Sequence, residues 1–203
     1  MKKIKLNPVL LLALVLGLTL NASAETPAPV MDPQMEAMMQ KFQEYSTLNE
    51  NHKALEVLVG SWDYRSQWWM KTNAKAEESV GTSEISWILN NHFLKQTVSG
   101  TSMGQIFEGI GLTGYNNLKK TYETIWIDTM ATGMMVGTAS FDSDKKVLSE
   151  QGNFSCPMVG GNRSYRTTTT ITDADHFKSE MFMIDPETNQ EFKIMELNYT
   201  RKK

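Results

Sequence analysis

The chain is poor in cysteine, in histidine and, over most of its length, in proline. Its 203 residues include one cysteine, Cys156, and three histidines. One cysteine cannot form an intrachain disulfide, so an apolar core has to stabilise the fold, and Cys156 is expected to be a small buried residue. Proline is absent between Pro33 and Pro157. This absence favours uninterrupted strand pairing, because proline has no N–H to donate to a neighbouring strand.

Long apolar runs are also missing. The longest extends from Val9 to Leu20, well short of the roughly 20 residues that a membrane-spanning helix needs. Three lysines precede this run within the first five residues, and Ala22-Ser23-Ala24 follows it. This order predicts a cleaved signal peptide at residues 1–24 and a mature chain from Glu25. We therefore expect an exported protein, periplasmic or secreted, with no stable membrane anchor.

Charge of one sign is not concentrated anywhere in the sequence. The formal net charge is −3, and removing the three lysines of the signal would take it to −6. A mildly acidic chain gives no sign of the basic patch that nucleic-acid binding requires, so no nucleic-acid partner is expected.

Sequence signatures of catalysis and of metal binding are absent as well. The sequence has no nucleophile motif, no His–carboxylate spacing and no Gly-rich phosphate loop. His52, His92 and His176 are too far apart in the sequence for the close spacing of a metal site, so no metal and no cofactor is expected. No histidine follows His176 toward the chain end.

The first recognisable element is a helix. Asp32-Pro33 supplies a helix start, and apolar residues then recur at spacings of three and four through Tyr45, which predicts an amphipathic helix. Its methionines are soft potential Cu(I) ligands, but such residues more commonly serve as apolar packing, and we expect the helix to cover a barrel end. We assign residues 25–51 to a leader and this helix, and residues 52–203 to one domain.

After Gly60 the hydrophobic period changes from that of a helix to that of a strand. In "WDYRSQWWM", Trp62, Tyr64 and Trp68 share one face, and similar alternating runs recur about every ten residues up to Lys203. Turn residues separate the runs, and no helix intervenes. The pattern predicts an all-β fold of about ten antiparallel strands in up-and-down order, which closes into a barrel and leaves no exposed edge.

One glycine pattern invites a different interpretation. Gly109, Gly111 and Gly114 have the spacing of a dinucleotide-binding turn. That turn needs a helix after its last glycine, whereas "YETIWID" follows here and alternates like a strand. We therefore predict that Gly109 and Gly111 lie on one face of a bent strand, where another group approaches closely.

Two sets of residues carry a family resemblance. "LVGSW" at residues 58–62 is similar to the opening signature of the lipocalin and calycin barrels. In those folds the tryptophan plugs one end of the barrel and a late basic residue lies across its ring. The resemblance implies this structural closure for Gly60, Trp62 and Arg201, with a cation–π contact worth ~0.5 to 2 kcal/mol.

The segments "HKALEVLVGSW", "GTSEISWILNNHFL" and "MELNYTRKK", together with residues 103–135, resemble the bacterial domain of unknown function family 1579. The resemblance spans roughly residues 52–203 and implies a lipocalin-like barrel without an assigned activity. The chain departs from the family where Leu89-Asn90-Asn91-His92-Phe93 replaces the usual Leu-Gly-Gly-Arg-Phe, and His92 is the one basic residue at this turn.

Charged residues within the apolar strands provide the candidate site. If they face inward, an arginine must pair with carboxylates, and the cluster forms the polar floor of a pocket for a small apolar or amphipathic ligand. If they face outward, they form surface salt bridges, and the sequence does not decide between the two faces. The candidate ligand-binding residues are Trp87, Glu108, Trp126, Asp128, Arg166, Glu180 and Glu196.

Two other functions remain open. A hydrolase or isomerase type of enzyme would use Asp128, Glu180 or Glu196 as acid and base, with burial raising one carboxyl pKa. A structural or interaction barrel would be fully packed and hold no ligand.

Overall fold

A computed structural model describes residues 32–185 and 188–203. The predicted signal peptide and most of the leader lie outside the described residues. Two units are distinguished, residues 1–39 and 40–203. None of the helices among the described residues is long and apolar enough to cross a membrane.

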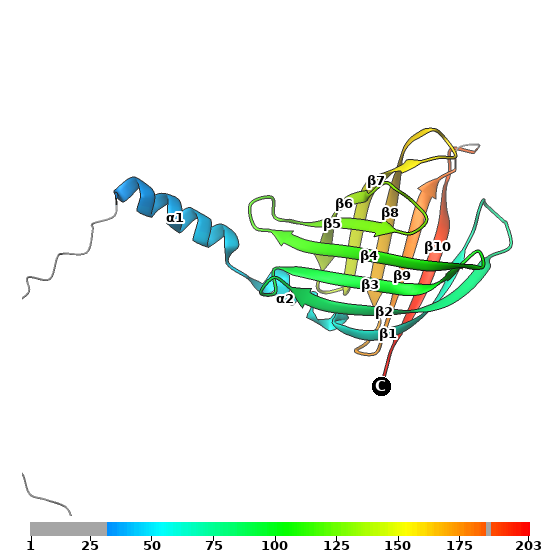
Figure 1. Cartoon of the computed structure of the whole chain (residues 1–203), viewed down its shortest axis with the longest axis horizontal. Helices are drawn as coiled ribbons and strands as arrows, with labels where there is room; N and C mark the ends of the chain where they lie inside the picture. Colours follow the sequence, from blue (N-terminus) through cyan, green and yellow to red (C-terminus); the bar gives the residue numbers. More distant parts are fainter. Residues whose placement is uncertain (1–31, 186–187) are drawn as a thin grey trace, which may run out of the picture. The chain divides into compact units, whose positions relative to one another are not determined.

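The barrel consists of ten antiparallel strands, each paired with its sequence neighbours, and β1 pairs with β10 to close it (Figure 1). This confirms the predicted up-and-down order. The strands are β1 (Gly60–Trp68), β2 (Glu77–Ile88), β3 (Phe93–Ser102), β4 (Gln105–Asn116), β5 (Thr121–Asp128), β6 (Met135–Asp142), β7 (Val147–Cys156), β8 (Gly161–Ile171), β9 (His176–Ile184) and β10 (Glu191–Arg201).

From residue 32 on, three helical segments precede the barrel: α1 (Pro33–Ser46), α2 (Glu50–Lys53) and the 3₁₀ turn η1 (Glu56–Leu58). Asp32 caps α1, since its carboxylate accepts a hydrogen bond from the backbone N–H of Gln34 at 2.7 Å. None of the residues of α1 is buried, so its apolar stripe is exposed in the described structure.

Side chains alternate between the interior and the outer face along the strands, as β1 shows most clearly. In β1, Trp62, Tyr64 and Ser66 are buried, whereas Asp63 and Arg65 are exposed. Strand pairing places Tyr64 opposite Tyr199 of β10, which is also buried. The inner face is therefore set by the alternation that the sequence predicts for β1.

The two barrel ends differ in how they are covered. At one end, here called the plugged end, η1 and the connections β2–β3, β4–β5, β6–β7 and β8–β9 surround Trp62. At the opposite end, here called the far end, lie the connections β1–β2, β3–β4, β5–β6, β7–β8 and β9–β10, toward the right and upper right of Figure 1. The plugged end therefore carries η1, and the far end is formed by strand connections alone.

Candidate binding site inside the barrel

The plugged end is held by Arg201. Its guanidinium lies 4.0 Å from the centre of the Trp62 ring and donates to the backbone oxygens of Val57 at 2.8 Å and Val59 at 2.7 Å. The indole of Trp62 donates to the oxygen of Leu58 at 2.9 Å. These contacts join β10 to η1 and close the plugged end, with the residues that the family resemblance implied.

Gly60 is required at this seal for two reasons. Its φ of 139° lies in a region that side-chain-bearing residues rarely adopt. A Cβ at this position would also lie 2.2 Å from Nη1 of Arg201. A side chain here would therefore displace the guanidinium from the carbonyl oxygens that it holds.

The glycines of β4 accommodate a tryptophan. A Cβ on Gly109 would lie 2.4 Å from the Trp126 ring, and one on Gly111 would lie 3.2 Å from it. β4 runs directly into a turn and then β5, with no helix between them. The glycine spacing therefore serves close packing of an aromatic ring across a strand, and the nucleotide-binding interpretation has no structural support.

An inward-facing carboxylate lies in the middle of the barrel wall. Oε1 of Glu150, on β7, accepts hydrogen bonds from Oγ1 of Thr124 at 2.6 Å and from the hydroxyl of Tyr165 at 2.8 Å. Gly137 lies beside this group, since a Cβ there would be 2.8 Å from Oγ1 of Thr124 and 2.9 Å from Oε1. Three strands, β5, β7 and β8, thus contribute to one polar cluster.

The second carboxylate oxygen of Glu150 is free to accept a hydrogen bond. Within the described residues, no group donates to Oε2 and no cation pairs with Glu150. The same residues contain no buried side-chain oxygen that lacks a partner, so Oε2 has to be accessible to solvent. An acceptor on the inner face of the barrel is therefore available to a ligand.

Methionines pack beside Tyr165 of the polar cluster. Tyr165 packs in one apolar cluster with Met181 and Met183, both buried, and with the half-buried Met135 and Met195. Unbranched thioether side chains adapt to irregular shapes, which suits a surface that contacts a flexible apolar molecule. The inner face near Glu150 therefore combines one acceptor with an adaptable apolar wall.

Burial raises the pKa values of several tyrosines on the inner face. It raises the pKa of Tyr165, and the negative charge of Glu150 raises that pKa further. Burial likewise raises the pKa of Tyr122 to about 12 and raises the pKa of Tyr199. All three tyrosines are therefore neutral hydrogen-bond donors near neutral pH.

Four of the seven predicted site residues lie on the outer face. Glu108 is exposed on β4, and Arg166 pairs there with Glu191 at 2.9 Å. Glu180 and Glu196 both pair with Lys193. Of the two arrangements that the sequence left open, these four residues therefore show the outer one, with salt bridges on the surface.

The pKa values of two outer carboxyl groups, those of Glu180 and Glu196, are lowered, whereas a general acid would need a raised value. Burial alone would raise the pKa of Glu180, but hydrogen bonds from Lys193 and Lys178 outweigh it and lower the pKa. A hydrogen bond from Lys193, followed by one from Asn198, lowers the pKa of Glu196. The raised carboxyl pKa on which the enzyme hypothesis depends is not found at either residue.

The other three predicted residues face inward but lie toward different ends. Trp126 and Asp128 share one face near the far end of β5, and the indole of Trp126 donates to Oδ2 of Asp128 at 2.7 Å. Trp87 lies near the plugged end of β2, and its indole donates to Glu56 of η1. Of the predicted set, Trp126 and Asp128 are the pair that the structure brings together on the inner face.

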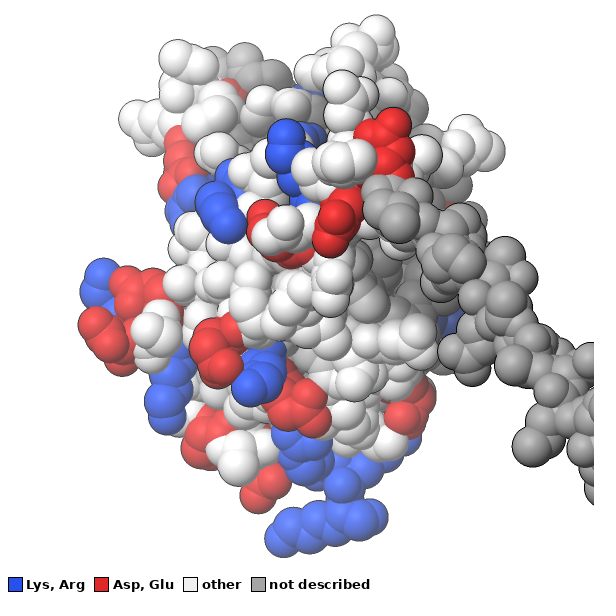
Figure 2. Space-filling view, turned by 90° about the vertical axis from the view of Figure 1, so that its left-hand side faces the viewer, with Lys and Arg blue, Asp and Glu red and all other residues white. Residues whose placement is uncertain are grey.

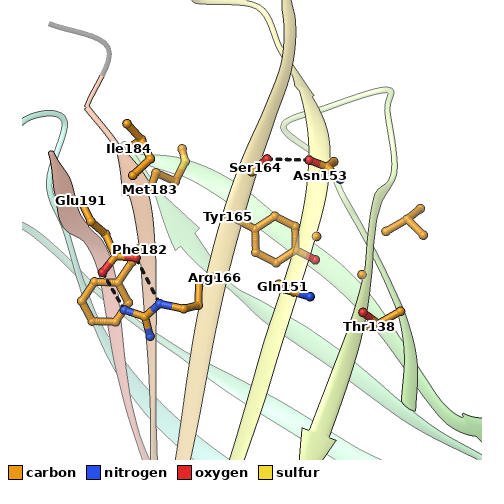
Figure 3. A pocket seen from close by; sticks show the side chains of 13 residues that line it. Thr138, Gln151, Asn153, Ser164, Tyr165, Arg166, Phe182, Met183, Ile184 and Glu191 are labelled. Carbon is orange, nitrogen blue, oxygen red and sulfur yellow. Dashed lines mark hydrogen bonds and ion pairs between the residues drawn. The ribbon is translucent and has the colours of Figure 1, made fainter. Parts of the chain in front are cut away.

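The outer wall carries a groove of about 450 Å³ across β6 to β10 (Figure 3). Arg166 crosses it, with its guanidinium 4.2 Å from the centre of the Phe182 ring and two hydrogen bonds to Glu191. Ser164 donates to Oδ1 of Asn153 at 2.8 Å. These polar groups form hydrogen bonds with one another, which is typical of side chains on the solvent-exposed face of a sheet.

A second outer groove, of about 490 Å³, extends across β2 to β5 and borders Glu108, Ile110 and Ile127. Acidic and basic side chains are interspersed on the face that Figure 2 shows, without a broad area of one sign. The surface in that view has no stripe of basic charge of the kind that nucleic-acid binding would need.

The histidines are separate and locally bonded. Nδ1 of His52 accepts from the backbone N–H of Asn49 at 3.1 Å, and His176 contacts Asp173 at 2.9 Å. The two ring nitrogens of His92 lie near the carbonyl oxygens of Leu89 and Ser46. In the described part of the chain, no three His, Cys, Asp or Glu side chains are grouped to hold a metal ion.

The residues of this barrel match a family model over residues 47–201, described as a protein of unknown function, DUF1579. The chain belongs to that family. Its match starts directly after α1 and ends at Arg201, so it contains the plug and all ten strands. No curated protein matches the sequence.

Two solved structures are similar to this DUF1579 member. The crystal structure of Rv2717c from M. tuberculosis has a TM-score of 0.55 at 17% identity and covers 77% of this chain and 100% of its own. The S-type phycobiliprotein lyase CPES from Guillardia theta has a TM-score of 0.54 at 10% identity, covering 80% of this chain and 97% of its own. At these identities the likeness shows the fold, a lipocalin-like barrel.

Proposed function

We propose that this protein binds a small apolar or amphipathic molecule on the inner face of its barrel, with Glu150 as the polar anchor. The observation that supports the proposal is the solvent-accessible Oε2 of Glu150, to which no described residue donates a hydrogen bond. Water can solvate this oxygen in the free protein. A ligand that donates a hydrogen bond would take the place of that water.

The arrangement also specifies the chemical class of the ligand. Oε1 of Glu150 is already occupied by two O–H donors, so the ligand has to approach Oε2 with a hydroxyl, an amino group or another N–H. Its apolar part would lie against the methionines near Tyr165. Barrels of this size hold one small ligand, so one donor group on one apolar body is the expected pattern.

Export of the protein is part of the proposal. The sequence predicts a cleaved signal, and an apolar ligand that is poorly soluble in water needs a carrier outside the cytoplasm. We accordingly place the binding function in the periplasm or the secreted fraction, without an enzymatic step.

A matched pair of ligands tests the anchor. Displacement of an environment-sensitive apolar dye is measured with 1-decanol and with its methyl ether, which lacks the O–H donor. Wild-type protein should bind the alcohol about tenfold more tightly than the ether, and Glu150→Gln should remove most of that preference, because a charge-assisted hydrogen bond is worth roughly 1.5 to 3 kcal/mol. Glu196→Gln, on the outer face, should behave like wild type.

Equal binding of the two compounds, or an unchanged preference in Glu150→Gln, would rule out Glu150 as the anchor. Failure of the wild-type barrel to take up any apolar dye would favour the fully packed structural barrel.

A further inference from the structure

Three neighbouring connections at the far end differ in charge from most connections at the plugged end. At the plugged end, the connections β4–β5, β6–β7 and β8–β9 contain lysines and aspartates, among them Lys119, Lys145 and Asp173. At the far end, the connections β3–β4, β5–β6 and β7–β8 contain no charged residue. These three connections are neighbours around the barrel, because strands β3 to β8 pair in sequence order.

The uncharged connections expose apolar side chains instead. Met158 is 81% exposed, Met103 59% and Met130 54%, and Ile106, at the start of β4, is 79% exposed. Single exposed apolar residues are common on proteins, but a set gathered at one end of a fold indicates an interaction surface. We call this set the methionine rim, and its members are Met103, Ile106, Met130, Met134, Met158 and Val159.

We infer that the methionine rim docks on a lipid bilayer. The connections β3–β4, β5–β6 and β7–β8 contain no charged residue, so their insertion into the membrane interface would remove none of their side-chain charges from water. An uncharged, apolar surface of this kind is complementary to the acyl layer. The adjacent β1–β2 connection carries Lys71 and Lys75 beside the exposed Met70, and lysines at this position suit anionic headgroups. Asp185, in the β9–β10 connection, is buried.

The benefit of docking, though not docking itself, rests on the proposed function. The rim lies along the β3 to β8 side of the far end. Met134 of the rim directly precedes Met135 of the inner apolar cluster. An apolar ligand could therefore pass between the bilayer and the barrel without crossing water. Docking itself does not require Glu150, so the two proposals can be tested separately.

The direct test measures the rate of peroxide oxidation at each methionine, by peptide mass spectrometry, with and without phosphatidylcholine vesicles. Vesicles should slow oxidation of Met103, Met130 and Met158 several-fold. Tethering through the N-terminal apolar run alone would leave these rates unchanged, and unchanged rates would overturn the inference.

A second arm uses matched variants in vesicle flotation. The rim variant carries Met103→Gln, Met130→Gln and Met158→Gln, and should float at least about threefold less than wild type. The control carries Leu89→Gln and Leu118→Gln at the plugged end, where the leucines are 70% and 80% exposed, and should float like wild type. Equal loss in both variants, or a rim variant that loses self-association but not flotation, would contradict docking through the rim.

Failure of the inference and failure of the proposed function give different results. Glu150→Gln should lose its ligand preference but float normally, and the rim variant should float poorly but keep equilibrium dye binding. Adding anionic phosphatidylglycerol should increase flotation of wild type, and Lys71→Gln with Lys75→Gln should remove that increase.

Discussion

The hydroxyl of Tyr165 donates a hydrogen bond to Oε1 of Glu150 at 2.8 Å across the paired strands β8 and β7. Thr124, on β5, donates to the same oxygen. One carboxylate oxygen is thereby fixed by the protein, and no described residue donates a hydrogen bond to the other. This division of the carboxylate is the feature from which the binding proposal follows.

Replacing Tyr165 by phenylalanine removes one of the two donors to Glu150. We expect Tyr165→Phe to lower the free energy of unfolding by about 1 kcal/mol, the usual net contribution of one hydrogen bond. Tyr64→Phe is the matched control, since the structure shows no hydrogen bond from the buried Tyr64 hydroxyl. Urea denaturation measures both, and equal losses would show that the Tyr165 hydroxyl contributes nothing beyond its packing.

The free energy of unfolding should fall at alkaline pH, because the pKa values of four tyrosine hydroxyls are raised in the folded protein. Burial raises the pKa values of Tyr64, Tyr122, Tyr165 and Tyr199 above the ordinary value of 10.0. Folding therefore favours the protonated phenols, so their stabilisation is complete below pH 10 and is lost as the pH rises through the folded-state values. Phenolate absorbance and circular dichroism should change together above about pH 11. Ionisation of all six tyrosines with the fold intact below that pH would contradict this account.

The plug should depend on the shape of the guanidinium as well as on its charge. Arg201 donates to three carbonyl oxygens, those of Val57, Val59 and Ala174. Lysine cannot reproduce this planar set of donors, so Arg201→Lys should cost at least about 2 kcal/mol of unfolding free energy. Lys202→Met, at the exposed neighbour, should cost little. A loss below about 0.5 kcal/mol in Arg201→Lys would show that the charge alone suffices.

The close approach of Trp126 to β4 makes Gly109 intolerant of a side chain. Gly109→Ala would place a methyl group 2.4 Å from the ring, and should cost about 1 to 3 kcal/mol and shift tryptophan fluorescence. Gly161→Ala is a suitable control, because its added Cβ meets nothing within 4 Å. If both substitutions have the same small effect, the ring moves aside freely and the glycine is not needed for packing.

The sequence predicted the strands, their order and a close approach at Gly109 and Gly111, but it did not decide which face of β4 is buried. Hydrophobicity alone would favour the face of Ile110 and Leu112. The glycines face inward because Trp126 fills the space above them, and Ile110 is exposed. One sequence alone carries no signal for this choice of face.

Glu150 was missed for a related reason. The inner face of β7 carries Leu148, Glu150 and Gly152, so hydrophobic alternation is weak along "VLSEQGNFS". Its partners Thr124 and Tyr165 are 26 and 15 residues away in the sequence, and their convergence depends on strand register. The outer positions of Glu180 and Glu196 follow from the same register, which pairs them across β9 and β10.

The measurement that tests the central claim most directly is native mass spectrometry of the protein purified from its own exported fraction, for wild type and Glu150→Gln in parallel. We predict a reproducible extra mass on wild type that denaturation releases and that is reduced or absent in the variant. A bare polypeptide mass for wild type, or the same extra mass at the same occupancy in both, would contradict binding through Glu150.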